Sequence, residues 1–308
     1  MIKSIIAIVM LCAGVAGAQD MHQRMRDWCG DGAVSLSLSG GQSTNTYTTN
    51  GVNWVAHIFT AIGTNTLTVT GGGDVEYLIV AGGGGGAGGA DLERGGGGGG
   101  AGGYRTGTVS VVSGVASIIV GAGGSGSGSG GGVSDQTSGG LSSALGVTSA
   151  GGGEAGDKQS GLGKNDGKPG GSGGGGTPSY SATVVTAYGG AGNTPITTPS
   201  QGNDGGDSTY QNMTTAGGGG GGAGGSGGSV ALSGSTGGAG GAGSQNSISG
   251  ASVIYAAGGK GGNRTGEVNG SNGAANTGNG GGGGSGSTVS VTGGAGGSGI
   301  VIIRYRTN

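Results

Sequence analysis

The sequence predicts a mainly β and irregular fold, in which a small β-sheet or hairpins flank a lattice of polyglycine II helices with loops between its glycine runs. Glycine makes up 94 of the 308 residues, and most of it is concentrated in runs. The apolar residues gather in short segments that alternate with polar residues or are rich in β-branched side chains, which is typical of strands. Two of these segments join glycine directly, so strands and runs are expected to belong to one folded unit.

Residues 1–18 are predicted to be an export signal. Lys3 supplies a positive start, residues 5–15 are apolar, and an A-x-A cleavage site ends at Ala18. The apolar stretch is too short to span a bilayer stably, so we expect an exported chain, secreted or at the cell surface, without a membrane span. The alternative is that the segment stays on as a hydrophobic helix, with Met21 as a later start.

Residues 19–50 are expected to connect the signal to the folded domain. Once the signal is removed, Cys29 is the only cysteine, so its thiol is either free or joined to another chain, and no internal disulfide can form. The alternating residues 34–38 are compatible with a first edge strand. The glycine-rich domain is therefore placed at residues 51–308.

The first strands of that domain are predicted at its N-terminal end. Residues 54–59 are rich in β-branched and aromatic side chains, whereas residues 64–70 alternate polar and apolar with a period of two. Residues 61–63 include a glycine and form the expected turn between the two strands.

Two further apolar segments, residues 74–81 and 299–305, meet glycine from opposite sides. The first runs into a glycine run and the second emerges from one. Continuous apolar segments of this length suit strands that are buried on both faces. We predict that these two strands pair and close the domain, with a small hairpin nearby at residues 109–120.

The glycine runs are predicted to be ordered as polyglycine II helices. In polyproline II geometry the backbone rises about 3.1 Å per residue with three residues per turn and no internal hydrogen bonds, so every N–H and C=O needs an outside partner. Only glycine lets such helices approach until they bond to one another. Because ordering a residue costs on the order of 1–2 kcal/mol, the alternative is a disordered linker, but the flanking strands favour an ordered domain. The runs are residues 81–90, 95–103, 121–132, 151–153, 170–176, 217–228, 237–243, 280–284 and 293–299.

Composition and motifs argue against catalysis, and we expect neither an enzyme nor a cofactor. The G-x-G-x-x-G patterns open no helix after a strand, and no Gly-Lys pair is followed by the Ser or Thr of a phosphate-binding loop. The two histidines, His22 and His57, are too few for a zinc site or a Ser-His-Asp triad, and His57 is expected to be structural. The net charge of −2 without a Lys/Arg cluster disfavours nucleic acid as a partner.

Tyrosines in the loops are the candidate contact residues. Aromatic side chains offer a large contact area at a low cost in conformational entropy. Some of these tyrosines could instead cover the ends of the lattice. The four candidates are Tyr180, Tyr188, Tyr210 and Tyr255.

A weak calcium candidate lies at residues 202–207, which read GNDGGD. The spacing of Asp204 and Asp207 resembles a glycine/aspartate calcium repeat. A single copy makes no calcium-binding roll, and the same residues are ordinary turn formers. No metal site is therefore assigned.

Several segments, in this order along the chain, resemble the glycine-rich domain family. They read VEYLIVAGGGGG at residues 75–86, GAGGYRTG at 100–107 and GGSGIVIIRY at 296–305, with shorter matches at residues 59–60, 120–124, 255–259 and 276–278. The resemblance covers about residues 52–306. It implies a polyglycine II sandwich, as in the tip adhesins of phage tail fibres and in related exported glycine-rich proteins.

The resemblance also implies a function. The expected protein is a non-catalytic surface or virion-associated binding protein whose loops recognise a cell-surface receptor or glycan. An export signal does not belong on a phage fibre made in the cytoplasm, so a virion tail fibre is the expected location only if the chain is phage-encoded. The alternative is a secreted, self-associating matrix or filament protein whose partners are copies of itself.

Overall fold

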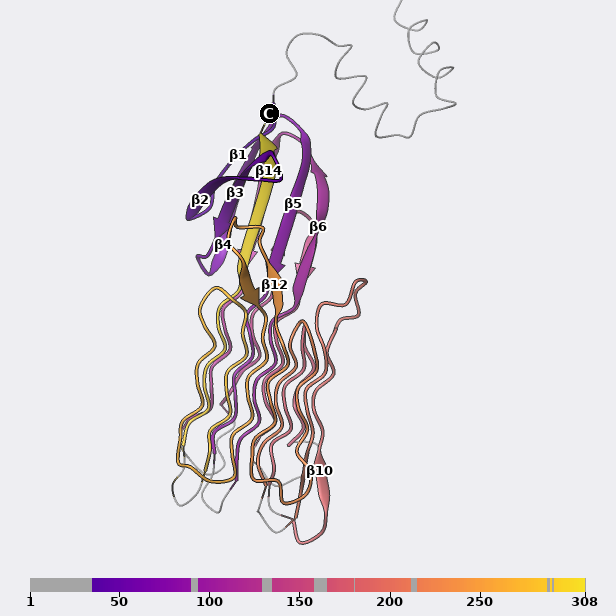
Figure 1. The fold of residues 1–308 in the computed structure, drawn as a ribbon, viewed down its shortest axis with the longest axis vertical. Coiled ribbons are helices and arrows are strands. Elements are labelled where there is room, and N and C mark those ends of the chain that lie inside the picture. Colours follow the sequence, from indigo (N-terminus) through magenta and orange to yellow (C-terminus); the bar gives the residue numbers. More distant parts are fainter. Residues whose placement is uncertain are drawn as a thin grey trace, which may run out of the picture.

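The protein is elongated, with β-strands at one end and glycine runs at the other (Figure 1). The computed structural model describes residues 35–89, 94–128, 135–157, 165–179, 181–211, 215–286, 289 and 291–307. The expected signal at residues 1–18 and Cys29 lie outside these ranges. The described residues form strands and irregular structure without a helix, so none of them provides a helix that could cross a bilayer.

The C-terminal strand lies at the centre of one five-stranded antiparallel sheet, here called the β14 sheet. Its strands in spatial order are β2 (Ser43–Thr49), β3 (Val52–Phe59), β14 (Ile300–Thr307), β5 (Gly73–Val80) and β6 (Tyr104–Val111). Ile302 of β14 lies opposite Ile58 of β3 and Leu78 of β5. The pairing predicted between residues 74–81 and 299–305 is therefore present. It follows from the apolar side chains on both faces of β14, which only a central strand can bury.

A second five-stranded sheet, the β7 sheet, lies against the first. Its strands in spatial order are β1 (Ser37–Ser39), β4 (Gly63–Thr70), β7 (Gly114–Val120), β8 (Ser142–Ala144) and β9 (Val147–Ser149). Apolar residues from both sheets form one buried cluster, to which Phe59, Leu67, Ile79, Ile118 and Ile303 each contribute a fully buried side chain. The strand end of the molecule is thus a β-sandwich with an ordinary side-chain core.

The predicted hairpin at residues 109–120 is wrong, because its two halves lie in different sheets. β6 pairs with β5 in the β14 sheet, whereas β7 pairs with β4 in the β7 sheet. The chain also crosses between the sheets from β4 to β5, and the two crossings are tied together by Ser113. Its hydroxyl accepts from the N–H of Gly71 and donates to the Gly71 carbonyl, both at 2.9 Å. Polar and apolar residues alternate in β6 and in β7 because each strand packs one face on the shared core. The two strands do not pair with each other.

The sheets also extend into residues that we expected to be connector. β1 pairs with β4 through Leu38 and Val69, and the Ser/Thr/Asn-rich β2 pairs with β3 along its whole length. β2 has polar and exposed side chains, which suits an edge strand that must not attract further strands.

The outer face of the β14 sheet is covered by a hairpin that emerges from the glycine region. Its strands are β12 (Ser244–Asn246) and β13 (Val253–Tyr255), and β12 lies beside the sheet in Figure 1. Ile248 and Tyr255 pack there against Leu78, Val80 and Ile302. A further small pair, β10 (Val185–Ala187) with β11 (Ser208–Tyr210), lies at the far end of the glycine region.

Residues 81–89 lie at the centre of the glycine region and show how the runs are held together. Their N–H groups donate to three neighbouring runs in turn, and the same neighbour returns at every third residue. Gly82 and Gly85 donate to the carbonyls of Gly140 and Thr137, at 2.9 and 3.0 Å. Gly83 and Gly86 donate in the same way to run 293–299, and Gly84 and Ala87 to run 95–103.

The carbonyls of the same central run accept from three further runs. Gly83 and Gly86 accept from Gly124 and Ser127 of one neighbour. The pattern repeats with the other two neighbours at the same spacing of three residues, so six runs surround the central one. They are residues 95–103, 121–128, 135–140, 150–157, 280–285 and 293–299. A three-residue period without bonds inside the run is what polyproline II backbone geometry predicts.

Close packing makes a side chain impossible at most positions of the central run. A Cβ added at Gly82 would lie 1.9 Å from the carbonyl oxygen of Ala122, and one at Gly85 would lie 1.7 Å from that of Ser125. Real Cβ atoms essentially never come within 3.0 Å of another heavy atom in this way. The close packing of the runs therefore requires glycine at these positions, and the high glycine content does not indicate a disordered chain.

Candidate functional site

The structure separates the four candidate tyrosines. Tyr188 follows β10 and exposes 61 % of its surface, as a contact residue requires. Tyr210 and Tyr255 are only 5 % and 3 % exposed, which leaves little surface for the contact expected of them. Tyr180 lies outside the described residues.

Tyr210 and Tyr255 are buried because both end short strands that fold back onto the rest of the molecule. Burial raises the pKa of Tyr210, and the negative charge of Asp166 raises it further. Burial also raises the pKa of Tyr255; a hydrogen bond with Ser249 offsets part of this rise and Tyr104 adds to it. Tyr255 packs against the apolar outer face of the β14 sheet, and Tyr210 ends a strand at the far end of the glycine region.

Asp204 and Asp207 use their carboxylates to bind backbone. Oδ1 of Asp204 accepts from the N–H of Gly192 at 2.7 Å, and Oδ1 of Asp207 accepts from the N–H of Gly189 at 2.8 Å. Within the described ranges, no group of three or more His, Cys, Asp or Glu side chains is placed to hold a metal ion. The two aspartates therefore act in the lattice, and their spacing of three residues matches its period.

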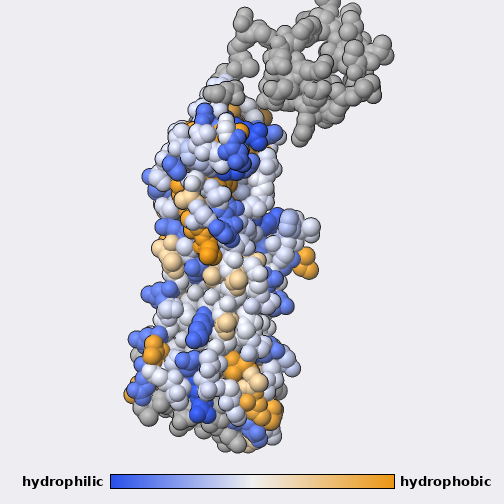
Figure 2. Space-filling view, in the orientation of Figure 1, coloured by the Kyte–Doolittle hydropathy of each residue, from blue (hydrophilic) through white to orange (hydrophobic). Residues whose placement is uncertain are grey.

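The end of the molecule opposite the sheets carries the loops that join the glycine runs (Figure 1). Exposed large apolar side chains are frequent in the described parts of these loops, and Figure 2 shows apolar patches at this end. Tyr188 is one of them, 61 % exposed. The others are Val184, Leu232, Val268 and Val289. Exposed large apolar side chains also lie outside these loops, at Ile62, Val112, Val115, Leu141, Ile196 and Ile254.

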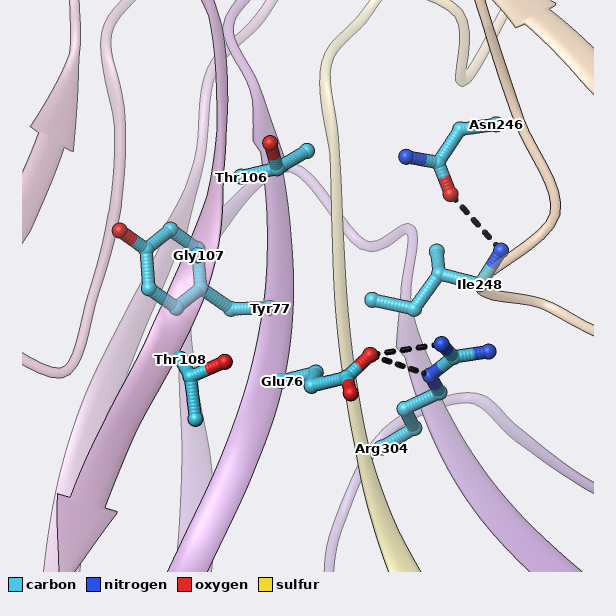
Figure 3. A pocket seen from close by; sticks show the side chains of 8 residues that line it. All are labelled: Glu76, Tyr77, Thr106, Gly107, Thr108, Asn246, Ile248 and Arg304. Carbon is cyan, nitrogen blue, oxygen red and sulfur yellow. Dashed lines mark hydrogen bonds and ion pairs between the residues drawn. The ribbon is translucent and has the colours of Figure 1, made fainter. Parts of the chain in front are cut away.

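A hollow of about 190 Å³ lies on the outer face of the β14 sheet, beside the β12–β13 hairpin (Figure 3). Its wall is formed by Glu76, Thr106 and Thr108 from the sheet and by Asn246 and Ile248 from the hairpin. Arg304 of β14 completes it and lies directly opposite Glu76 in the strand register.

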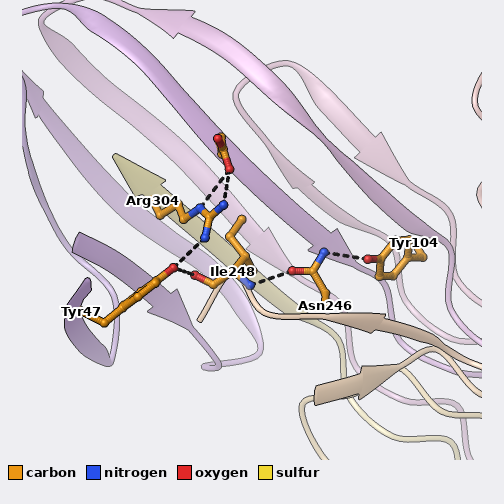
Figure 4. Close-up of polar contacts among 6 residues, drawn as sticks. Tyr47, Tyr104, Asn246, Ile248 and Arg304 are labelled. Carbon is orange, nitrogen blue, oxygen red and sulfur yellow. Dashed lines mark hydrogen bonds and ion pairs between the residues drawn. The ribbon is translucent and has the colours of Figure 1, made fainter. Parts of the chain in front are cut away.

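The charges that line this hollow are paired with each other. Nη2 and Nε of Arg304 donate to Oε2 of Glu76 at 2.6 and 2.9 Å, and Nη1 donates to the hydroxyl of Tyr47 at 2.8 Å (Figure 4). The Arg304 guanidinium also stacks on the ring of Trp54, 4.1 Å from its centroid. Burial alone would lower the pKa of Arg304, but the bonds from Tyr47 and Glu76 raise it above its usual value, so the cation is permanent.

The same network fastens the hairpin to the sheet. The Tyr47 hydroxyl donates to the Ile248 carbonyl at 2.7 Å, and the Ile248 N–H donates to Oδ1 of Asn246 at 2.7 Å. Nδ2 of Asn246 then donates to the hydroxyl of Tyr104 at 2.8 Å (Figure 4). The hollow is thus the seam between the sandwich and the glycine region, and its one carboxylate is engaged by Arg304. Its geometry supports a locking role more than a reaction.

His57 lies inside the sandwich and not in the hollow. Its ring is 5 % exposed and stacks on Tyr305 with centroids 6.1 Å apart. Nδ1 lies 2.8 Å from the carbonyl oxygen of Gly40, so Nδ1–H is the donor. This is the structural role expected from its place in a strand.

Sequence reasoning missed the Glu76–Arg304 pair. Both residues interrupt apolar strands that were expected to pair, so two opposite charges in those strands were a signal of a cross-strand ion pair. The link to Tyr47 and Ile248 carried no such signal, because more than 200 residues separate Tyr47 from Ile248.

Comparison with known proteins identifies the family but adds no described function. A family model, the glycine-rich domain, matches residues 59–306. A search of curated proteins found no match. The matched region runs from the end of β3 to the end of β14 and includes the whole glycine lattice. The chain therefore belongs to the glycine-rich domain family.

Proposed function

We propose that this protein is a non-catalytic, exported binding protein, in which the glycine lattice carries the far loops to a cell-surface receptor or glycan. The observation that supports it is the polarity of the molecule. β1 and the end of β14 lie at the free end of the sandwich, as the pairs Ser37 with Thr70 and Thr307 with Asn53 require. The loops that carry Val184, Tyr188, Leu232, Val268 and Val289 lie at the opposite end (Figure 1).

The glycine region suits the role of a rigid spacer. We interpret its runs as polyglycine II helices, in which a nine-residue run spans roughly 28 Å at a rise of about 3.1 Å per residue. Each inner run is bonded to six others, so the loops at its end are held at fixed relative positions. A preorganised set of loops loses less entropy on binding than loops on a flexible chain.

Tyr188 and Val184 are the described residues that should contribute most to this surface. They lie on either side of β10 and expose 61 % and 54 % of their surfaces. Aromatic and apolar side chains at the centre of a contact dominate binding energy.

Exchange of these side chains tests the proposal. The variant Val184→Ser with Tyr188→Ser should lose at least about tenfold in affinity, equal to about 1.4 kcal/mol, for intact bacterial cells or for whichever member of a glycan array the wild type binds. Val112→Ser is the matched control, because Val112 is 80 % exposed and lies in the crossing at the sheet end. Equal loss in both variants, or no binding by the wild type to cells or glycans, would contradict the proposal.

A further inference from the structure

The outermost glycine runs have N–H groups that no neighbouring run can accept from, unlike the inner runs. A run with neighbours on one side only lacks a backbone carbonyl for some of its three N–H directions. Run 187–193 is such a case: Gly190 and Asn193 donate to the carbonyls of Gly174 and Gly171. The N–H groups of Gly189 and Gly192, three residues apart, have no backbone carbonyl as a partner, and that of Tyr188 donates to Oδ1 of Asp166 at 2.7 Å.

At this edge the missing run is replaced by two side chains. The carboxylates of Asp207 and Asp204 accept from Gly189 and Gly192, at 2.8 and 2.7 Å. The neighbouring backbone runs alongside, since Gly205 donates to the carbonyl of Gly190 at 2.9 Å. The aspartates therefore reach from an adjacent run into the position that the next run would occupy.

A second edge repeats the arrangement with amides. Oδ1 of Asn269 accepts from the N–H of Thr292 at 3.0 Å, and Oδ1 of Asn272 accepts from that of Ala295 at 2.9 Å. Their own run donates back, because the N–H of Gly270 donates to the carbonyl of Thr292 at 2.8 Å. Two unrelated edges thus carry the same device, with oxygen-bearing side chains at positions i and i+3.

The spacing explains why these residues recur in pairs. With three residues per turn, positions i and i+3 of a run present their side chains on the same face, about 9.3 Å apart at a rise of about 3.1 Å. The N–H groups of a neighbouring run recur at the same interval. Asp or Asn is long enough to place its oxygen on an N–H, which a glycine at that position cannot do.

We propose that these two pairs terminate the glycine lattice and prevent a second copy of the chain from extending it. An open lattice edge offers a row of backbone donors to any other glycine run, much as an open sheet edge does to another strand. Because the cap oxygens occupy the N–H donors of Gly189, Gly192, Thr292 and Ala295 and the space beside them, a glycine run of another molecule cannot bind in these directions. The carboxylate pair adds charge repulsion between two copies that approach through this edge.

Removing the caps should turn these edges into sites of self-association. The variant Asp204→Ala with Asp207→Ala should show a concentration-dependent rise in sedimentation coefficient at concentrations where the wild type shows none. Asp204→Asn with Asp207→Asn keeps the oxygens and loses only the charges, so it should self-associate much less than the alanine variant. Asp74→Ala is the matched control, because this aspartate lies on β5 and accepts from the Ser110 hydroxyl instead of a lattice N–H. An alanine variant that folds and sediments like the wild type would overturn the proposal.

Asn269→Ala with Asn272→Ala repeats the test at the other edge, and single Asp204→Ala serves if either double variant fails to fold. Amide exchange in the wild type gives a measurement that needs no variant. Gly189 and Gly192 should exchange at least about tenfold more slowly than Ala191, which is exposed and whose N–H has no hydrogen-bond partner among the described residues. Equal exchange at all three positions would show that the caps do not hold and would also overturn the proposal.

Discussion

The two ends of this molecule are ordered by opposite means. The sandwich is held by side chains: Phe59, Leu78 and Ile302 are completely buried between or against its sheets. The lattice has almost no side chains to bury and is held by N–H···O=C bonds from each run to its neighbours. The two regions should therefore be destabilised by opposite changes. Replacing a buried residue by a smaller one should destabilise the sandwich, whereas replacing a glycine by a larger residue should destabilise the lattice.

A single methyl group added to the lattice should lower the free energy of unfolding more than any other change considered. In Gly85→Ala the new Cβ would lie 1.7 Å from the Ser125 carbonyl oxygen, and both partners are backbone held by further runs. We expect a loss above the usual 1–3 kcal/mol of an overpacked core, roughly more than 3 kcal/mol, or no folded protein. Denaturant unfolding or soluble yield measures it.

Gly225→Ala is the control for this change. The added Cβ would lie 3.8 Å from its nearest neighbour, the backbone nitrogen of Ala242. The replacement should cost less than about 0.5 kcal/mol. Equal tolerance of alanine at both positions would refute the close packing of the runs.

The converse change should harm the sandwich. Ile302→Ala removes a side chain that is 0 % exposed at the centre of the β14 sheet, and large-to-small changes of this type cost about 2–5 kcal/mol. Ile254→Ala, at a position 60 % exposed in the hairpin, should cost less than about 0.5 kcal/mol. Chemical denaturation of the two variants gives the comparison, and similar midpoints would contradict a side-chain core at this end.

A smaller effect is expected at the seam between the two regions. Glu76→Gln removes the charge that Arg304 contacts at 2.6 Å, while Tyr47 remains as a partner. Both side chains are partly exposed, at 17 % and 32 %, so solvent screening reduces the expected loss to about 1 kcal/mol. Asp74→Asn, which changes an exposed acid on the same strand, is the control. If Glu76→Gln lowers the free energy of unfolding no more than Asp74→Asn does, the Glu76–Arg304 pair does not stabilise the junction between the sandwich and the glycine region.

The smallest effect at neutral pH is expected from Tyr255→Phe. Burial raises the pKa of Tyr255, so the folded chain keeps a proton that the unfolded chain loses near pH 10. The stability that this tyrosine contributes is present below about pH 10 and is lost as the pH rises through the folded pKa. Tyr255→Phe should therefore flatten the alkaline fall in unfolding free energy. Parallel alkaline curves for Tyr255→Phe and the wild type would contradict this role.

The sequence predicted the long strands well because their pattern is local. The period of two in residues 64–70 and the apolar residues 300–303 determine which faces are buried before any partner is known. The crossing between β6 and β7 could not be predicted in this way, since an alternating pair of segments looks the same in one sheet or in two. The two-sheet arrangement involves a contact between residues far apart in the sequence, Ser113 and Gly71.

The site was less predictable than the fold. Tyr188 and the buried Tyr210 are both tyrosines in glycine-rich surroundings, and only the three-dimensional arrangement distinguishes an exposed side chain from a covering one. Asp204 and Asp207 were considered for calcium because of their spacing. The same spacing has a different cause in this fold, because the N–H groups that the two carboxylates accept from, those of Gly189 and Gly192, are also three residues apart.

Amide hydrogen exchange can show whether the lattice is ordered by its backbone, because it reports on each backbone hydrogen bond in the intact chain. Gly84, Gly85 and Gly86 donate to three different runs at 2.8–3.0 Å, and Ile302 lies in the centre of the β14 sheet. If backbone hydrogen bonds hold the lattice in one ordered structure, the amide hydrogens of the three glycines exchange as slowly as that of Ile302, within about tenfold. Exchange of these glycines at the rate of an unstructured peptide, with Ile302 still protected, would show that only the sandwich is ordered and would contradict the account.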